Sequence, residues 1–264
     1  VITLWPHPRY VLEKNHLELR YLSTIDEKTI LIENEGIDHL VIIPFSMEFS
    51  QMESCEFIRE FMIGKMKIKH LLVGYDHKFG KDRVGDIEIL QKCSPEDDFS
   101  ISRVEAYDFE NTRISSSIIR ELLLEGELDK ANHYLNYNYF LLGTVVEGDK
   151  IGREIGFPTA NIKLQDKNKL LPKIGVYAVY LSFEGNIYPG MLNIGFRPTV
   201  DSGNHQKSIE VHLFDFKKNI YRKRVALAFH KRMRDEQKFD TLEELKEQLE
   251  KDKAVARKLL KDLI

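Results

Sequence analysis

The chain has 264 residues, and at about 100 to 200 residues per domain this length predicts two domains. Its 39 lysine and arginine residues nearly balance 42 aspartate and glutamate residues, for a formal charge of −3. That charge excludes a protein that holds nucleic acid or an anionic membrane through a general basic field. Apolar residues make up 42% of the chain, and no apolar run approaches the roughly 18 residues of a membrane span. We therefore expect two globular domains that bind neither nucleic acid nor a membrane.

The cysteines and the start of the chain indicate the compartment. Cys55 and Cys93 stand in no Cys-x-x-Cys or His/Cys cluster, so we expect buried free thiols, and neither a disulfide framework nor structural zinc. Residues 1–9 lack the basic and apolar regions of a secretion signal. Both features fit a reducing cytoplasm. Because Val1 stands inside an expected strand, we also expect a stretch of chain before it.

In the first half of the chain, short apolar runs alternate with helical patterns. The capping-box pair Thr24 and Glu27 opens a helix that Gly36 can end, and Ser115 begins a helix that Gly126 ends. The other expected elements are strands at 1–4, 39–43 and 68–73 and a helix at 53–63 stopped by Gly64. Alternating strands and helices predict a parallel sheet covered on both faces, with the ligand site in the loops after the carboxyl ends of the strands.

Beyond residue 139 the pattern changes to β-type runs joined by turns such as Glu184-Gly185-Asn186. The runs cover residues 141–146, 176–183, 187–194, 208–216 and 224–229. They predict an antiparallel barrel or sandwich, and we place the junction between the domains near residues 136–138. The expected domains are therefore 1–138 and 139–264.

A terminal helix follows the β-rich half. Thr241 and Glu244 form a second capping box. The apolar face of this helix is expected to consist of Leu242, Leu245, Leu249, Val255, Leu259 and Leu263. We expect the helix to pack on the β domain, with a coiled coil or a partner helix as the alternative.

Residues 148–161, Gly-Asp-Lys-Ile-Gly-Arg-Glu-Ile-Gly-Phe-Pro-Thr-Ala-Asn, carry the densest chemical signal. The glycines recur every fourth residue, which fits neither the Rossmann G-x-G-x-x-G pattern nor a Walker P-loop. Glycine-rich backbone beside Lys150 and Arg153 can still hold a phosphate chain, and Thr159 and Asn161 offer neutral oxygens suited to Mg²⁺. The segment therefore indicates a metal–nucleotide site, with an ordinary barrel turn as the alternative.

Motifs spread over roughly residues 139–264 resemble one family. In order, they are Gly152-Arg153, Gly156-Phe157-Pro158-Thr159-Ala160-Asn161, Leu171-Pro172, Gly175-Val176-Tyr177-Ala178, Asn193-Ile194-Gly195, Arg197-Pro198-Thr199, Glu210-Val211-His212-Leu213 and Arg234-Asp235-Glu236-Gln237-Lys238-Phe239. Together they resemble the riboflavin kinase domain. The resemblance implies an antiparallel six-stranded β-barrel with a C-terminal helix, which transfers the γ-phosphate of ATP to the ribityl 5′-hydroxyl of riboflavin.

The resemblance assigns the catalytic base of this reaction to Glu210, which would take the proton of the attacked hydroxyl. Its strand alternates Ile209, Val211 and Leu213 with Glu210 and His212, so both polar side chains share one face of the sheet. For Glu210 the alternative is a solvated outer face. His212 is expected to be structural.

The remaining kinase residues surround the phosphates. Thr159 and Asn161 would hold Mg²⁺ and the phosphates, and Gly152 with Arg153 would form a flap over them. Arg234 is a weaker candidate for a flavin contact, and an ordinary surface arginine is the alternative.

A second set of motifs lies in the first half: Pro6-His7-Pro8-Arg9, Val73-Gly74-Tyr75-Asp76 with Phe79-Gly80, Gly85-Asp86, and Ile114-Ser115-Ser116-Ser117-Ile118-Ile119-Arg120. They resemble the FMN adenylyltransferase domain of bifunctional bacterial FAD synthases, which implies a nucleotidyltransferase α/β fold that converts FMN to FAD. Ser117 stands where that family usually has threonine. The family's opening glycine-rich turn and His-x-x-His motif are not in this sequence, so we expect little FAD synthesis without an upstream segment.

The expected adenylyltransferase site gathers residues from several motifs, namely His7, Asp76, Phe79, Ser115, Ser116, Ser117 and Arg120. Serine hydroxyls and free N–H groups at a helix start, with an arginine one turn later, suit a triphosphate. Plain N-capping explains one of the serines but not all three. A structural turn between prolines is the alternative for His7.

Two other classes of protein compete with the bifunctional enzyme. The first is a riboflavin kinase whose first half is a non-catalytic flavin- or nucleotide-binding module. The second is a barrel that binds single-stranded nucleic acid, which is disfavoured because Tyr177, Tyr180 and Phe183 do not share one strand face. The expected partners are the small molecules ATP, riboflavin and FMN, and the oligomeric state, a weak homo-oligomer included, stays open.

Overall fold

The computed structural model describes residues 1–12, 19–74, 87–94, 99–106, 108–109, 112–148, 151–197 and 206–260. Its internal contacts divide the chain into two compact units. The first comprises Val1–Leu19 and Ile32–Ile114, and the second comprises Arg20–Leu31 and Ser115–Ile264. The boundary expected near residues 136–138 stays a prediction.

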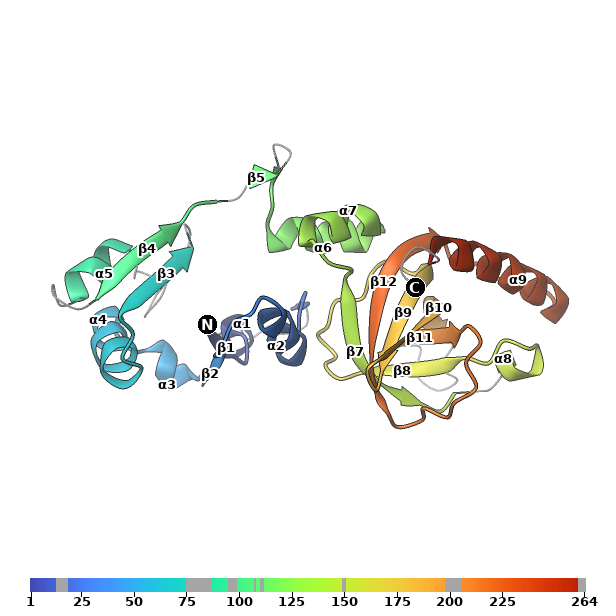
Figure 1. Ribbon diagram of the computed structural model, residues 1–264, viewed down its shortest axis with the longest axis horizontal. Helices are drawn as coiled ribbons and strands as arrows, with labels where there is room; N and C mark the ends of the chain where they lie inside the picture. The colour runs from blue at the N-terminus through green and yellow to red at the C-terminus, as the bar shows by residue number, and fades with distance from the viewer. Residues whose placement is uncertain are drawn as a thin grey trace. The chain divides into compact units, whose positions relative to one another are not determined.

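The first unit alternates short strands and helices, as Figure 1 shows. Its strands are β1 (Ile2–Trp5), β2 (Val41–Pro44), β3 (His70–Gly74), β4 (Ser100–Val104), β5 (Asp108–Phe109) and β6 (Thr112–Arg113). Its helices are α1 (Pro8–Leu12), α3 (Met47–Ser50), α4 (Ser54–Glu56), η2 (Phe57–Lys65) and α5 (Ile87–Cys93). Strand β1 pairs with β2 and β3 with β4, both in parallel, which confirms the expected α/β class.

The helix expected to stop at Gly64 does not stop there. From Phe57 to Lys65 it is a π-helix, and the amide of Met66 donates to the carbonyl of Phe61 at 2.9 Å. The wider π turn brings the carbonyl oxygen of Arg59 to within 3.1 Å of where a Cβ on Gly64 would lie. Gly64 therefore allows a close contact inside the helix and does not end it. The chain leaves the helical direction only at Lys67, whose φ is +52°.

The expectation of two buried free thiols was wrong. Cys55 and Cys93 are joined by a disulfide with their Cα atoms 5.1 Å apart. Cys93 is buried and Cys55 is exposed. Their separation of 38 residues in the sequence gave no sign that the helices carrying them lie side by side.

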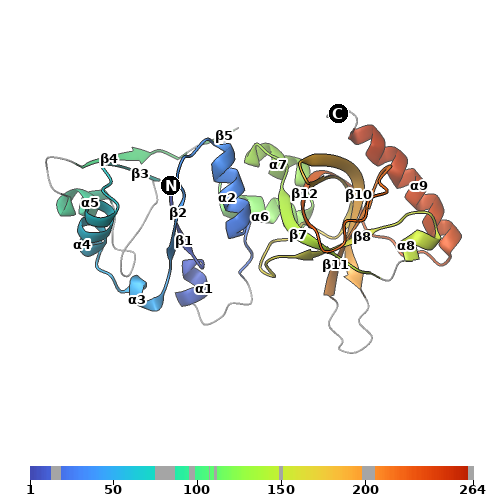
Figure 2. The same cartoon turned by 60° about the horizontal axis from the view of Figure 1, so that its bottom comes forward.

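The second unit is built on a closed six-stranded antiparallel barrel in the order β10-β11-β8-β7-β12-β9 (Figure 2). The strands are β7 (Phe140–Val146), β8 (Ala160–Leu164), β9 (Gly175–Phe183), β10 (Asn186–Arg197), β11 (Gln206–Leu213) and β12 (Arg224–Arg234). Fully buried side chains alternate along them and fill the interior: Leu141, Val145, Tyr177, Val179, Leu181, Leu192, Ile194, Val211, Leu227 and Phe229. The predicted antiparallel β domain is confirmed as a barrel.

Three strands end three or more residues away from their predicted ends, and β8 was not among the predicted runs. Strand β10 continues to Arg197, beyond its predicted end at residue 194. Strand β11 ends at Leu213 because Asp215 has a φ of +54° and turns the chain. Strand β12 continues beyond Phe229 to Arg234, with register shifts after Phe229 and Arg232. Such bulges break the alternation of apolar residues from which strand length was predicted.

Helix α9 (Leu242–Leu259) packs on the outer face of the barrel, as expected. Its Ala256 and the following Leu260 are buried against a set of barrel residues, Phe157, Ala178, Tyr180, Met191 and Phe214. The predicted apolar face was wrong at Leu242 and Val255, which are 51% and 49% exposed; Leu263 lies outside the described residues. The buried stripe instead runs through Asp252, whose charge hid it from a search for apolar periodicity.

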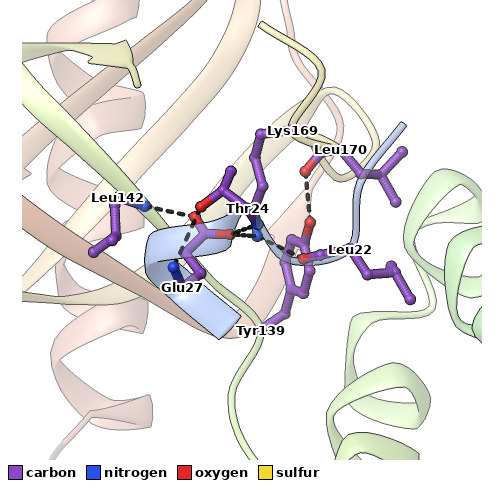
Figure 3. A network of polar contacts seen from close by, with 7 residues as sticks. All are labelled: Leu22, Thr24, Glu27, Tyr139, Leu142, Lys169 and Leu170. Atoms are coloured by element: carbon purple, nitrogen blue, oxygen red, sulfur yellow. Dashed lines mark hydrogen bonds and ion pairs between the residues drawn. The ribbon is translucent and has the colours of Figure 1, made fainter. Parts of the chain in front are cut away.

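Helix α2 (Ile25–Asn34) is fixed to the barrel through Glu27 (Figure 3). One carboxylate oxygen of Glu27 accepts from the backbone amide of Leu142 in β7 at 2.9 Å. The other accepts from the Thr24 amide at 2.9 Å and from Lys169 Nζ at 2.7 Å. The Lys169 ammonium also donates to the carbonyl of Leu22 at 2.8 Å. The predicted capping box is confirmed, and its glutamate also forms a buried ion pair.

Tyr139 completes this network (Figure 3). Its ring centroid lies 4.2 Å from Lys169 Nζ, and its hydroxyl donates to the carbonyl of Leu170 at 2.7 Å. Burial lowers the pKa of Lys169 to about 8, against the opposing pull of Glu27. Burial also raises the pKa of Tyr139 well above its usual value.

Two further helices, α6 (Ser116–Glu125) and α7 (Leu128–Leu135), precede the barrel. Helix α6 begins at the cap residue Ser115, as predicted, and ends at Gly126, whose φ is +88°. A short helix, α8 (Ile151–Glu154), lies between β7 and β8.

Candidate functional site

Three polar residues form a row across three neighbouring strands of the barrel. Glu210 of β11 is the register partner of Asn161 in β8 on one side and of Asn193 in β10 on the other. Register partners in antiparallel strands point to the same face, with Cβ atoms about 4.5 to 5.5 Å apart. The neighbours of these residues along the strands, such as Ile194 and Val211, fill the barrel interior. The row therefore lies on the outer face, with the carboxylate between two amides.

Thr159, the residue before β8, lies next to this row. Its hydroxyl donates to Oε2 of Glu210 at 3.4 Å. The backbone leading to Thr159 is held by His212, whose Nδ1 lies 2.9 Å from the carbonyl oxygen of Pro158 and whose ring packs 5.1 Å from that of Phe157. Burial lowers the pKa of His212. These contacts fit the structural role expected for this histidine.

The glycines before β8 allow two close approaches. A Cβ on Gly148 would lie 2.0 Å from Nδ2 of Asn161, and one on Gly152 would lie 2.3 Å from the carbonyl oxygen of Phe157. The amide of Phe157 donates to the carbonyl of Gly152 at 2.7 Å, which draws α8 against the start of β8. Arg153 is exposed on α8, and Lys150 lies outside the described residues. The flap role of Gly152 and Arg153 stays a prediction.

Asn193 was missed as a site residue, although its motif carried the resemblance. Its Nδ2 donates to Oε1 of Glu236 at 3.2 Å. Its Oδ1 is buried and has no hydrogen-bond partner among the residues that the structure describes. The available signal was one polar residue between two apolar ones, Leu192 and Ile194, and only the strand register shows that it lies beside Glu210.

Arg234 is bound to the terminal helix. Its Nε and Nη2 donate to the carboxylate of Asp252 at 3.0 and 2.6 Å, and its Nη1 donates to the carbonyl of Asp235 at 2.8 Å. Asp252 is 3% exposed. This ion pair holds α9 on the barrel, so Arg234 is more than an ordinary surface arginine, and its flavin contact stays a prediction.

The donor set around Glu210 fits a hard cation. The described residues contain no group of three or more His, Cys, Asp or Glu side chains that could hold a metal ion. Magnesium needs no such group, because it usually takes one or two protein oxygens and keeps its other ligands from water and phosphate. The Thr159 hydroxyl and the Asn161 amide, beside a carboxylate, provide oxygens of this kind.

The described residues expected at the adenylyltransferase site divide between the two units, with His7 in the first and Ser115, Ser116, Ser117 and Arg120 in the second. His7 lies at the start of α1, where its Nδ1 accepts from the amide of Arg9 at 3.2 Å. Ser115 caps α6 by accepting from the amide of Ile118 at 3.4 Å, and Ser116 and Ser117 are exposed on its first turn. Arg120 Nε donates to the carbonyl of Arg20 at 3.1 Å. Asp76 and Phe79 lie outside the described residues, so this site stays a prediction.

An open hollow of about 520 Å³ lies elsewhere on the barrel unit. Asp26, Leu142, Glu184 and Arg224 are among the residues that line it. Among the described residues, its lining contains none of the site residues predicted from the sequence. The chemistry therefore points to the row around Glu210 and not to this hollow.

Known proteins match both halves of the chain. A family model described as riboflavin kinase matches residues 135–260, and one described as FAD synthetase matches residues 1–118. A bifunctional riboflavin kinase/FMN adenylyltransferase of Bacillus subtilis is 36% identical over 267 residues, which cover 100% of this chain and 83% of that protein. The chain belongs to the bifunctional riboflavin kinase/FMN adenylyltransferase family. A member from Escherichia coli K12 is also 36% identical, over 89% of this chain and 74% of its own.

A solved structure supports the same fold across both units. A chain from Streptococcus pneumoniae, titled a macrolide-efflux protein, is 31% identical, with a TM-score of 0.86 over 97% of this chain and 82% of its own. None of the helices described for the present chain has the length and apolar character needed to cross a membrane.

Proposed function

We propose that the barrel unit of this bifunctional enzyme phosphorylates riboflavin with Glu210 as its general base. A kinase needs an acceptor for the proton of the attacked hydroxyl, placed beside the groups that hold the phosphates. The observation that carries the assignment is the row Asn161–Glu210–Asn193, with the Thr159 hydroxyl 3.4 Å from the carboxylate. A non-catalytic binding module would have no need of a carboxylate there.

In the proposed step, the ribityl 5′-oxygen of riboflavin forms a bond to the γ-phosphorus of ATP while its proton passes to the carboxylate of Glu210. The bond between the γ-phosphorus and the β,γ-bridging oxygen breaks, and ADP leaves with that oxygen. Thr159 and Asn161 would hold Mg²⁺, which supplies charge neutralisation for the phosphates when bound. Gly152 and Arg153 on α8 would cover the phosphate chain, and because ATP is the donor we place the reaction in the cytoplasm.

The first half of the chain carries the second activity of the family, the adenylylation of FMN to FAD. We assign its nucleotide contacts to His7, Asp76, Phe79, Ser115, Ser116, Ser117 and Arg120. The support is the match of residues 1–118 to the FAD synthetase family and the exposed hydroxyls on the first turn of α6. These would meet the phosphates of ATP at a helix N-terminus.

The test is to supply the purified chain with riboflavin and Mg-ATP and to measure FMN and ADP by chromatography. We expect FMN from the unmodified chain and almost none from Glu210→Gln, while both bind riboflavin in a flavin-fluorescence titration. A chain that binds riboflavin but never forms FMN would instead be a binding module. Incubation with FMN and ATP tests FAD formation separately.

A further inference from the structure

The amide of Asn193 has a fixed orientation. Its partner, Oε1 of Glu236, lies 3.2 Å from its nitrogen. An ionised carboxylate only accepts hydrogen bonds, so the amide must turn its nitrogen to Glu236 and its oxygen away from it. That oxygen is buried and has no donor among the described residues, and a buried unpaired acceptor is costly. The site therefore presents an acceptor that a ligand can satisfy.

Gly195 makes room for this arrangement. A Cβ at Gly195 would lie 1.9 Å from Oε1 of Glu236 and 2.9 Å from Nδ2 of Asn193. Only glycine lets the segment after β12 bring the carboxylate of Glu236 this close to strand β10. Two segments far apart in the sequence thus combine to orient one amide.

The position of Asn193 relative to Glu210 indicates which substrate it meets. Asn161 and Thr159 lie on the β8 side of Glu210, whereas Asn193 lies on the β10 side. Neighbouring strands are about 4.8 Å apart, so the two amides are separated by about 10 Å across the base. A base that takes a proton during phosphate transfer stands between donor and acceptor. With the phosphates on the β8 side, the hydroxyl acceptor belongs on the β10 side.

We propose that Asn193 binds a hydroxyl of the polyol side chain of the acceptor, next to the hydroxyl that reacts, and that Glu236 is the positioning residue for its amide. Phosphate oxygens offer no hydrogen to an amide oxygen at neutral pH, but a polyol offers several. Binding one of its hydroxyls fixes the chain so that the terminal hydroxyl faces Glu210. This inference rests on the proposed kinase function of the barrel unit.

The experiment compares two acceptors, riboflavin and a flavin carrying a 5-hydroxypentyl side chain, which keeps only the reacting hydroxyl. We expect Asn193→Ala to lower kcat/KM for riboflavin by about 10- to 100-fold, the usual effect of losing a hydrogen bond to a buried group. With the hydroxypentyl flavin the unmodified chain already lacks that bond, so the variant should match it. Asn186→Ala, at an exposed asparagine on the same strand, is the matched control and should change neither value.

Glu236→Ala keeps the proposal testable if Asn193→Ala folds poorly, because Glu236 is exposed. It frees the amide to rotate, so we expect a smaller loss that is again confined to riboflavin. Equal losses with both acceptors would make Asn193 merely structural, and a loss that added Mg²⁺ relieves would make it a metal ligand. Either result, or an unchanged riboflavin value, overturns the inference. If the unmodified chain forms no FMN at all, the proposed function fails, and the inference fails with it.

Discussion

Two carboxylates of the barrel unit, Glu27 and Glu210, stand in contrasting surroundings. Both oxygens of Glu27 accept hydrogen bonds, from Thr24, Leu142 and Lys169, and the side chain is 1% exposed. Glu210 is half-buried, and within the described part of the chain it has one long contact, from the Thr159 hydroxyl at 3.4 Å. The first carboxylate has its partners within the fold, whereas the described residues use little of the hydrogen-bonding capacity of the second.

This difference predicts different effects of substitutions around Glu27 and around Glu210. Removing one member of a complete buried network leaves its partners without compensation, so the effect should appear in stability. Removing a member of the open row, Asn161–Glu210–Asn193, leaves little unsatisfied within the protein, so the effect should appear in catalysis or binding. Each of the following changes tests one side of this division.

The largest expected effect is on turnover. Glu210→Gln removes the proposed proton acceptor while keeping the shape of the side chain, and the loss of a general base typically lowers the rate by ~10² to 10⁴. We expect kcat for FMN formation to fall by that factor while riboflavin binding persists. The free energy of unfolding should change by less than about 0.5 kcal/mol, as for substitutions outside the packed core. A large loss of stability without loss of turnover would reverse the assignment of the two carboxylates.

The next effect is on stability. Glu27→Gln leaves the Lys169 ammonium buried without its carboxylate, and breaking a buried pair in this way costs about 3 to 5 kcal/mol. The double variant Glu27→Gln, Lys169→Met removes both charges and should recover most of that loss. Hydrogen exchange of barrel amides under native conditions measures both effects within the barrel unit. A double variant no more stable than Glu27→Gln alone would show that the charges themselves are not the cause.

A smaller effect is expected at Asn161 and at Gly148, which lies against it. Asn161→Ala removes a proposed oxygen ligand of the metal, so KM for Mg-ATP should rise by about tenfold, with partial relief at high Mg²⁺. Gly148→Ala should act in the same way, because its Cβ would lie 2.0 Å from Nδ2 of Asn161 and push that amide aside. The two changes together should be no worse than Asn161→Ala alone. Additive losses would mean that Gly148 acts on something else.

Local signals in the sequence predicted some of the structural features of the barrel unit. The capping box of Thr24 and the end of α6 at Gly126 were correct because each depends on a few neighbouring residues. Thr241 caps α9 as predicted, but Glu244 accepts from the amide of Asp240, one residue before the cap. The second role of Glu27 could not be predicted, since its partner Lys169 lies 142 residues away. The strand content also predicted a β domain, but the bulges of β12 hid its length.

The candidate site, too, was only partly predictable from the sequence. Glu210, Thr159 and Asn161 were named from motifs, and the structure brings them together. Asn193 also stands in a motif, Asn193-Ile194-Gly195, but no role was assigned to it. Its place beside Glu210 depends on the register of β10 against β11, which cannot be predicted from the sequence. The disulfide of Cys55 and Cys93 was missed for the same reason, because two distant helices must first pack.

The smallest effect concerns pH and the histidine that holds the segment before Thr159. Burial lowers the pKa of His212 below its usual 6.5; Lys253 and Arg257 on α9 lower it further, while the Pro158 carbonyl and Glu250 oppose the shift. As the pH falls through 6.5, the unfolded chain therefore binds a proton at this residue before the folded chain does, and the free energy of unfolding decreases. His212→Gln keeps an amide donor for the Pro158 carbonyl but cannot titrate. We expect urea unfolding curves between pH 7 and 5 to show a shallower loss of stability for His212→Gln than for the unmodified chain. Identical slopes would mean that protonation of His212 does not contribute to the acid sensitivity of the barrel.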